Sequence, residues 1–149
     1  MSKDTKFFVR LSFVVFPLAF LLLFMQVALL VSPMSWWIEY EDVIPLADKI
    51  GVGTKPRFKS VVEINKECNL HYNDIMFCKP DGMEKFTYSS EYFSTTYGKK
   101  PGKEENEWTY GHKLWDIGEC YLKSNIILML PFGVEKVQTV IGAKFRVDA

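Results

Sequence analysis

The chain has 149 residues, 48% of them hydrophobic, and its 18 Lys and Arg residues balance its 18 Asp and Glu residues. This balance argues against a dedicated nucleic-acid-binding protein, because such proteins usually carry a basic excess. The length favours one domain plus an appendage, and the part of the chain after residue 32 is long enough to close one hydrophobic core.

The first predicted element is an apolar helix. Residues 11–32, LSFVVFPLAFLLLFMQVALLVS, contain no charged side chain. A helix of this length, rising about 1.5 Å per residue, crosses a hydrocarbon core of roughly 30 Å. Gln26 is its only strongly polar side chain, and it either hydrogen-bonds a neighbouring helix and favours oligomers or reaches toward the membrane interface. We therefore predict a transmembrane helix over residues 11–32.

A cleaved secretory signal is the alternative to a permanent anchor. A signal peptide has an apolar region of about 7–15 residues and small residues ahead of the cut. The apolar run is longer than that, Leu30 and Ser32 fit the small-residue pattern poorly, and Pro33 follows directly. The pattern favours an uncleaved signal anchor, with a secreted domain as the alternative.

Flanking charges predict the orientation of this span. Basic side chains precede it and acidic side chains follow it, so the positive-inside rule places residues 1–10 in the cytoplasm as a short tail. We expect a single-pass protein of the inner (cytoplasmic) membrane, with its C-terminal domain in the periplasm or outside. The basic residues are Lys3, Lys6 and Arg10, and the acidic residues are Glu39, Glu41 and Asp42.

Residues 33–56 are predicted to form an aromatic membrane-exit segment and a stalk. Trp36, Trp37 and Tyr40 are expected at the outer headgroup level, where amphipathic rings are enriched. Packing of Trp37 or Tyr40 into the domain is an open alternative. Proline and glycine residues between positions 45 and 56 indicate a flexible stalk.

Residues 57–149 carry strand patterns and no convincing helical periodicity. Residues 120–130 are the clearest case, since the even positions are mostly apolar. Six or seven short strands with regular turn signals predict an all-β antiparallel sandwich of immunoglobulin-like size and pattern, although the characteristic Cys…Trp…Cys spacing is not clearly present. The expected strand regions are 58–65, 70–78, 85–97, 107–115, 120–130 and 136–147.

The cysteines predict one disulfide if the domain lies on an oxidising side. Cys120 has the apolar parity of its strand, and Cys78 ends another strand before a turn. We favour a Cys78–Cys120 bridge, with Cys68–Cys78, Cys68–Cys120 and no bridge as alternatives.

The sequence offers weak evidence for site chemistry. A zinc site needs about four converging ligands, whereas Cys68, His71 and His112 are scattered. Strand residues three apart point to opposite faces, which disfavours a Cys68–His71 nucleophile pair. We therefore predict no catalytic, metal or cofactor site and no enzymatic activity.

Aromatic side chains are dense in the predicted domain. Most of them are expected in the core or as cross-strand partners. Because Trp and Tyr are favoured at interfaces, Trp108, Tyr110 and Trp115 are candidate interaction aromatics. The polar stretch 99–107 is expected to form a solvated loop at a hairpin tip.

These features predict a membrane-anchored protein that presents its β domain as a protein-interaction module at the cell envelope. Its partners would be the lipid bilayer and either an envelope protein or other copies of the chain, and nucleic acid is not expected. The alternative is a membrane-active protein in which span and domain act together. That layout is similar to some phage lysis and superinfection-exclusion proteins.

Overall fold

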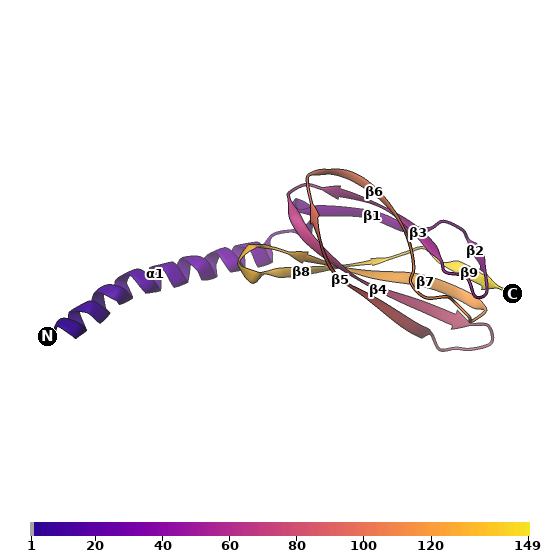
Figure 1. Cartoon of the computed structure of the whole chain (residues 1–149), viewed down its shortest axis with the longest axis horizontal. Coiled ribbons are helices and arrows are strands. Elements are labelled where there is room, and N and C mark those ends of the chain that lie inside the picture. The colour runs from indigo at the N-terminus through magenta and orange to yellow at the C-terminus, as the bar shows by residue number, and fades with distance from the viewer. Residues whose placement is uncertain (1) are drawn as a thin grey trace.

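The computed structural model of the chain describes residues 2–149, except for the side chains at positions 41, 88 and 91–95. A long N-terminal helix projects from one end of a β-rich domain, and the C-terminus lies at the opposite end of that domain (Figure 1). This arrangement confirms the predicted order of an apolar helix followed by a β domain.

The helix α1 spans Lys3–Val31, and none of its side chains is buried. Ser2 caps it, since the Ser2 hydroxyl oxygen accepts a hydrogen bond from the backbone of Thr5 at 3.2 Å. The helix ends at Ser32, whose backbone N–H bonds the carbonyls of Ala28 and Leu29. In residues 2–149, α1 is the one helix long and apolar enough to cross a membrane, as judged by length and composition.

The first sheet has three antiparallel strands in the order β1–β3–β6. The short 3₁₀ helix η1 (Met34–Trp36) lies between α1 and β1. The end of α1 and the start of the first sheet are therefore only a few residues apart in the sequence. The strands are β1 (Ile38–Pro45), β3 (Arg57–Ile64) and β6 (Gly102–Thr109).

The second sheet has six strands in the order β2–β9–β7–β4–β5, with β8 also pairing to β7. Its pairs are antiparallel except for β2 with β9, which are parallel. The 3₁₀ helix η2 (Pro131–Gly133) connects β7 to β8. The strands are β2 (Lys49–Gly51), β4 (Cys68–Pro80), β5 (Thr87–Lys99), β7 (Gly118–Met129), β8 (Glu135–Ile141) and β9 (Phe145–Asp148).

The two sheets face each other across a core that consists of two clusters. Strand β7 shows the predicted alternation, because every even-numbered residue from Gly118 to Leu128 is buried. The distal cluster, which is the one farther from α1, includes Phe58, Cys78, Tyr110 and Leu122. The cluster near the helix includes Ile38, Val62, Leu70, Ile126 and Leu128.

The predicted Cys78–Cys120 disulfide is present. These residues stand directly opposite each other in the β4–β7 register, with their Cα atoms 4.2 Å apart. Cys68 is buried and, among the described residues, carries the free thiol. The inward parity of residue 120 therefore led to the correct pairing.

The segment predicted as an exit segment and stalk contributes strands to both sheets. β1 pairs with β3 along its length, and its Ile38 and Val43 side chains are buried in the core. The register shifts between Tyr40 and Val43, so the inward positions of β1 are not spaced by two throughout. This irregularity conceals the strand pattern in a segment that is also rich in acidic residues.

Candidate functional site

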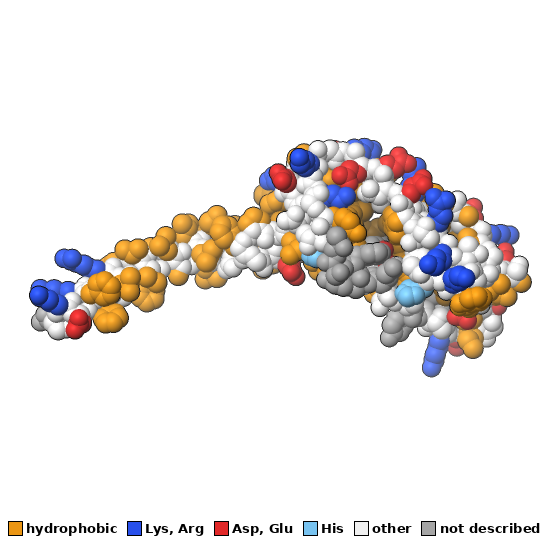
Figure 2. Space-filling view, in the orientation of Figure 1, with side chains coloured by type: hydrophobic (Ala, Val, Ile, Leu, Met, Phe, Trp, Pro, Cys, Tyr) orange, Lys and Arg blue, Asp and Glu red, His pale blue; other side chains and the backbone are white. Residues whose placement is uncertain are grey.

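A cleft of about 260 Å³ lies between the two sheets, and residues of both sheets line it. β5 ends one sheet and β6 ends the other, and the cleft is lined from both of these edge strands. The face shown in Figure 2 is hollowed beneath the charged side chains of its upper edge. The cleft lining includes Tyr40, Tyr72, Asp74, Tyr97, Lys99 and Trp108.

The interior of the cleft carries two hydrogen-bonded polar pairs. The Tyr40 hydroxyl donates to the Tyr72 hydroxyl at 2.7 Å. Ser124 donates to the carboxylate of Asp74, whose exposed fraction is only 3%. Tyr40 and Tyr72 also pack against the core cluster near the helix, so this polar pair lies at the edge of that cluster.

Burial controls the ionisation of the two tyrosines. Desolvation raises the pKa of Tyr72 to about 12, against an ordinary value near 10. Desolvation also raises the pKa of Tyr40 above its ordinary value, and the neighbouring Tyr72 raises it further. Both hydroxyls are therefore protonated near neutral pH, and the Tyr40 hydroxyl donates to the Tyr72 hydroxyl.

Two contacts frame the cleft by linking β5 to β6 and to the residue that follows β6. Where the chain passes from β5 to β6, Lys99 forms an ion pair with Glu104 at 2.7 Å, and its side chain is only 15% exposed. At the other end of β6, the Tyr110 hydroxyl donates to the backbone carbonyl of Ser89 at 3.0 Å. These contacts hold β5 and β6 at fixed positions on either side of the cleft.

Trp108 is the cleft residue with an unmet hydrogen-bonding group. Its ring packs against Phe58, with the ring centroids 5.9 Å apart. Its Nε1 atom is buried and has no partner among the described residues. A buried donor without a partner costs about 1–3 kcal/mol, so an acceptor supplied by a ligand would be favourable.

The helix end is attached to the domain by side-chain hydrogen bonds. The Gln26 side-chain amide donates to the backbone carbonyl of Phe132 at 2.8 Å. The Lys136 ammonium donates to the Leu29 carbonyl and to the Ser32 hydroxyl, each at 3.3 Å. The β7–β8 connection thus lies against the last turns of α1.

The segment that follows α1 is contacted by the residues that directly follow β3. The side chain of Asn65 donates to the Ser35 carbonyl at 2.8 Å. The Lys66 ammonium lies 5.6 Å from the ring centroid of Trp36 and 5.3 Å from that of Trp37. Cation–π contacts of this kind orient the rings at the helix–domain junction.

The three predicted interface aromatics have different surroundings. Trp36 is 57% exposed, in agreement with a side chain open to a headgroup region. Trp37 is half-buried and packs against the core cluster near the helix. Tyr40 lies in the cleft and bonds Tyr72, as in the alternative that this side chain packs into the domain. Strand β1 turns this residue toward the opposite sheet.

The predicted interaction aromatics are also separated by the fold. Tyr110 is fully buried in the distal core cluster, so it is a core residue rather than part of an exposed patch. Trp108 lines the cleft, whereas Trp115 is 69% exposed and packs beside Gly53. The structure therefore leaves Trp108 and Trp115 at two distinct locations.

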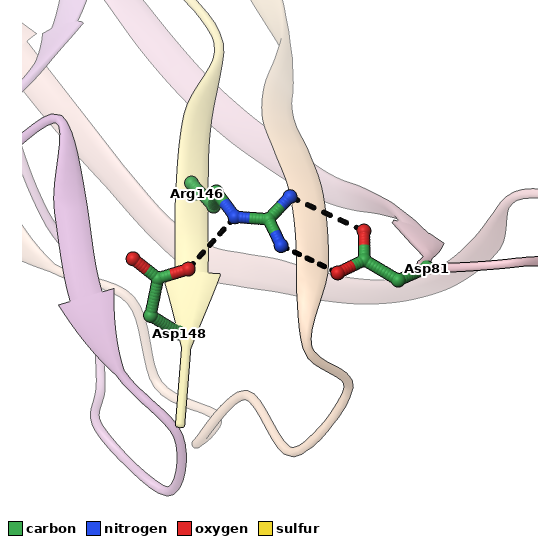
Figure 3. A network of polar contacts seen from close by, with 3 residues as sticks. All are labelled: Asp81, Arg146 and Asp148. Atoms are coloured by element: carbon green, nitrogen blue, oxygen red, sulfur yellow. Dashed lines mark hydrogen bonds and ion pairs between the residues drawn. The ribbon is translucent and has the colours of Figure 1, made fainter.

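A charged network joins elements at the distal end of the domain (Figure 3). The Arg146 Nε donates to the Asp148 carboxylate at 2.7 Å, and its two terminal nitrogens donate to the two carboxylate oxygens of Asp81. The hydrogen bond from Arg146 holds the pKa of Asp81 below its usual range. This contact ties the turn after β4 to β9.

One pair of residues in the sequence is a signal for the cleft. Asp74 and Ser124 both occupy inward positions of alternating strands, and they are opposite each other in the β4–β7 register. A polar residue at an inward strand position indicates a buried polar contact. No group of three or more His, Cys, Asp or Glu residues able to hold a metal occurs in the described part of the chain.

No protein-family model matches the chain, and no curated protein is similar to it in sequence. Among solved structures, the sporulation control protein Spo0M from Bacillus subtilis is 17% identical, with a TM-score of 0.38, over 76% of this chain and 50% of that one. The β-glucosidase EmGH1 from Erythrobacter marinus is 10% identical, with a TM-score of 0.44, over 74% of this chain and 15% of that one. The alkylpurine DNA glycosylase AlkC from Pseudomonas fluorescens is 12% identical, with a TM-score of 0.43, over 75% of this chain and 30% of that one. The chain thus spans half or less of each of these proteins.

Proposed function

We propose that this chain is a single-pass membrane-anchored protein whose β domain binds a partner protein outside the membrane. The observation that carries the proposal is α1, a largely apolar helix with no buried side chain, whose final turns hydrogen-bond the domain. A helix that is apolar on all sides is stable when lipid surrounds it. The charges that flank the span support a cytoplasmic N-terminus in an inner membrane.

The cleft between the sheets is the proposed binding site. Binding pockets combine apolar walls with a few placed polar groups, and this cleft combines aromatic walls with Asp74, Lys99 and the Trp108 donor. Its volume, about 260 Å³, falls below that of typical small-molecule pockets. A protruding side chain or a short loop of a partner protein fits this volume, and a carbonyl or carboxylate on it would meet the Trp108 N–H.

The domain is proposed to act by binding rather than by catalysis. The buried carboxylate of Asp74 accepts a hydrogen bond from Ser124, and the two tyrosine hydroxyls bond each other. These contacts favour a rigid recognition surface. The partner is an envelope protein or a second copy of this chain.

Site-specific photo-crosslinking in bacterial membranes tests the proposal. A benzophenone amino acid is placed at Tyr97, which lines the cleft, and at Ile44, an exposed β1 residue outside it, in separate full-length proteins. We expect a discrete adduct from position 97, none from position 44, and loss of the adduct when Trp108→Phe is added. An adduct of twice the chain mass identifies self-association, and any other mass identifies another protein. A folded, membrane-bound protein that gives no adduct at position 97 contradicts the proposal.

A further inference from the structure

The β7–β8 turn lies beside the helix at a depth where lipid is expected. A hydrocarbon core of about 30 Å that begins at Leu11, directly after Arg10, ends near residue 30 at about 1.5 Å per residue. Gln26 then lies about 6 Å below the outer boundary of that core. Because the Gln26 amide donates to the carbonyl of Phe132, the turn lies at the same depth.

The backbone of this turn is suited to a low-dielectric environment. Pro131 has no N–H group, and its carbonyl accepts a hydrogen bond from Val134. The carbonyl of Phe132 accepts from Gln26, and the Leu130 N–H donates to the Val134 carbonyl at 2.8 Å. Lipid penalises backbone groups that lack partners, so these contacts lower the cost of inserting the turn.

The side chains of the turn present apolar surface outward. Phe132 is 45% exposed and adopts a φ of 61°, in the left-handed region that a non-glycine residue rarely occupies. The stretch from Ser124 to Val134 contains no charged residue, and Val137 on β8 is also exposed. The turn residues 131–134 carry no charge, although Glu135 and Lys136 begin β8 directly after them. An exposed phenylalanine at the tip of such a turn is costly in water and favourable in lipid.

Basic and aromatic groups lie just above this level. The Lys136 ammonium contacts the carbonyl of Leu29, which lies near the calculated boundary of the core. Lys66 and the exposed ring of Trp36 lie next to the point where the chain leaves the predicted membrane span. Ammonium groups and Trp rings are both favoured at headgroup depth. Apolar groups below and basic groups above match the layers of a leaflet.

We propose that residues 131–133 form a second membrane contact, in which Phe132 inserts into the outer leaflet beside the helix. Gln26 holds the inserted turn against the helix, and Lys136 contacts lipid phosphate groups. The domain is then fixed in orientation on the membrane surface, rather than free to rotate about its anchor. This inference rests on the proposed function, since it requires α1 to span the bilayer.

Depth-dependent quenching tests the inference with the full chain. Phe132, Phe86 and Phe20 are replaced in turn by Cys in a Cys68→Ala background, labelled with an environment-sensitive nitrobenzoxadiazole dye and reconstituted into phosphatidylcholine–phosphatidylglycerol vesicles. Phe86 is the matched control, because it is 43% exposed and belongs to the β4–β5 connection, which lies at the end of the domain opposite the helix (Figure 1). Phe20 reports the span itself. Nitroxide-labelled lipids quench a dye that contacts the acyl chains.

We expect blue-shifted emission and strong quenching at positions 20 and 132, and neither effect at position 86. Adding Gln26→Leu should reduce quenching at position 132 by at least twofold and leave position 20 unchanged. Quenching at position 20 with water-like emission at position 132 would overturn the insertion while the anchor stands. Water-like emission at position 20 would overturn the anchor and the insertion together.

Discussion

The side-chain amide of Gln26 donates a hydrogen bond to the backbone carbonyl of Phe132, two residues that are 106 positions apart in the sequence. This bond joins the strongly polar residue of the apolar run to the turn between β7 and β8. The polar group therefore has a partner in its own chain, and α1 and the domain meet in a defined geometry. The helix–domain junction is consequently a structured part of the molecule.

Replacing Gln26 with Leu should loosen this junction without removing the anchor. The substitution leaves the Phe132 carbonyl without its partner, which costs about 1–3 kcal/mol where that group is shielded from water. We expect faster hydrogen exchange at residues 130–136, while the protein stays in the membrane fraction. Ser12→Ala is the control, because the Ser12 hydroxyl bonds the Phe8 carbonyl within the helix. Unchanged exchange in Gln26→Leu would contradict a role for this bond in the junction.

The Cys78–Cys120 disulfide should contribute substantially to the stability of the domain. The bridged residues are 42 positions apart, and the chain-entropy model assigns about 4 kcal/mol to a loop of that length. We expect the double variant Cys78→Ala, Cys120→Ala to unfold at a much lower urea concentration than the unaltered protein. The control Cys68→Ala should lose far less stability. Three reactive thiols in non-reduced protein from the oxidising side would contradict the bridge.

Stability should depend on pH through Asp81. Arg146 lowers the pKa of the folded Asp81 carboxyl below its unfolded value of about 3.9. A carboxyl with a depressed folded pKa stabilises the fold above the unfolded pKa, and this contribution is lost as the pH falls through the folded pKa.

The measurement for this prediction is the Tm of Asp81→Asn and of the unaltered protein between pH 2 and pH 7. We expect the Tm of Asp81→Asn to be lower at pH 7 and the difference to shrink below about pH 4. Glu84→Gln, an exposed change in the same β4–β5 connection, serves as the control. A difference that stays constant across the range would show that the ion pair does not carry the effect.

Trp108→Phe should separate binding from stability. The Phe ring keeps apolar contact with Phe58 but removes the buried Nε1 donor that lacks a partner. We expect a free energy of unfolding within about 1 kcal/mol of the original value, since the lost donor offsets part of the lost packing. Crosslinking from position 97 should fall at least tenfold. Full crosslinking by a stable Trp108→Phe protein would exclude Trp108 as a recognition group.

Sequence patterns predicted the elements that depend on local periodicity. The charge-free run predicted the helix, and the alternation in residues 120–130 identified the buried face of β7 and the orientation of Cys120. The immunoglobulin-like classification stays a prediction. By contrast, β1 was not predicted as a strand, because its register shifts between Tyr40 and Val43 and this shift breaks the two-residue period.

Contacts between residues far apart in the sequence could not be predicted from local sequence patterns. The parallel β2–β9 pair joins Lys49–Gly51 to the last strand of the chain, and three residues carry too little pattern to predict a partner. The partner of Gln26 lies in a turn that the sequence marks only as a break. The cleft was predictable in part, because Asp74 and Ser124 are polar residues at inward positions, but Tyr40 reaches it only through the irregular β1.

The central claim is that α1 stays in the chain as an anchor and holds the domain outside the membrane. Single cysteines replacing Lys3 or the exposed Trp115, in a Cys68→Ala background, report the two sides in bacterial spheroplasts treated with a membrane-impermeant maleimide. The account predicts that position 115 is labelled at once and position 3 only after permeabilisation, with both proteins in carbonate-washed membranes. Labelling in the reverse order, or a soluble protein that begins near Pro33, would contradict it.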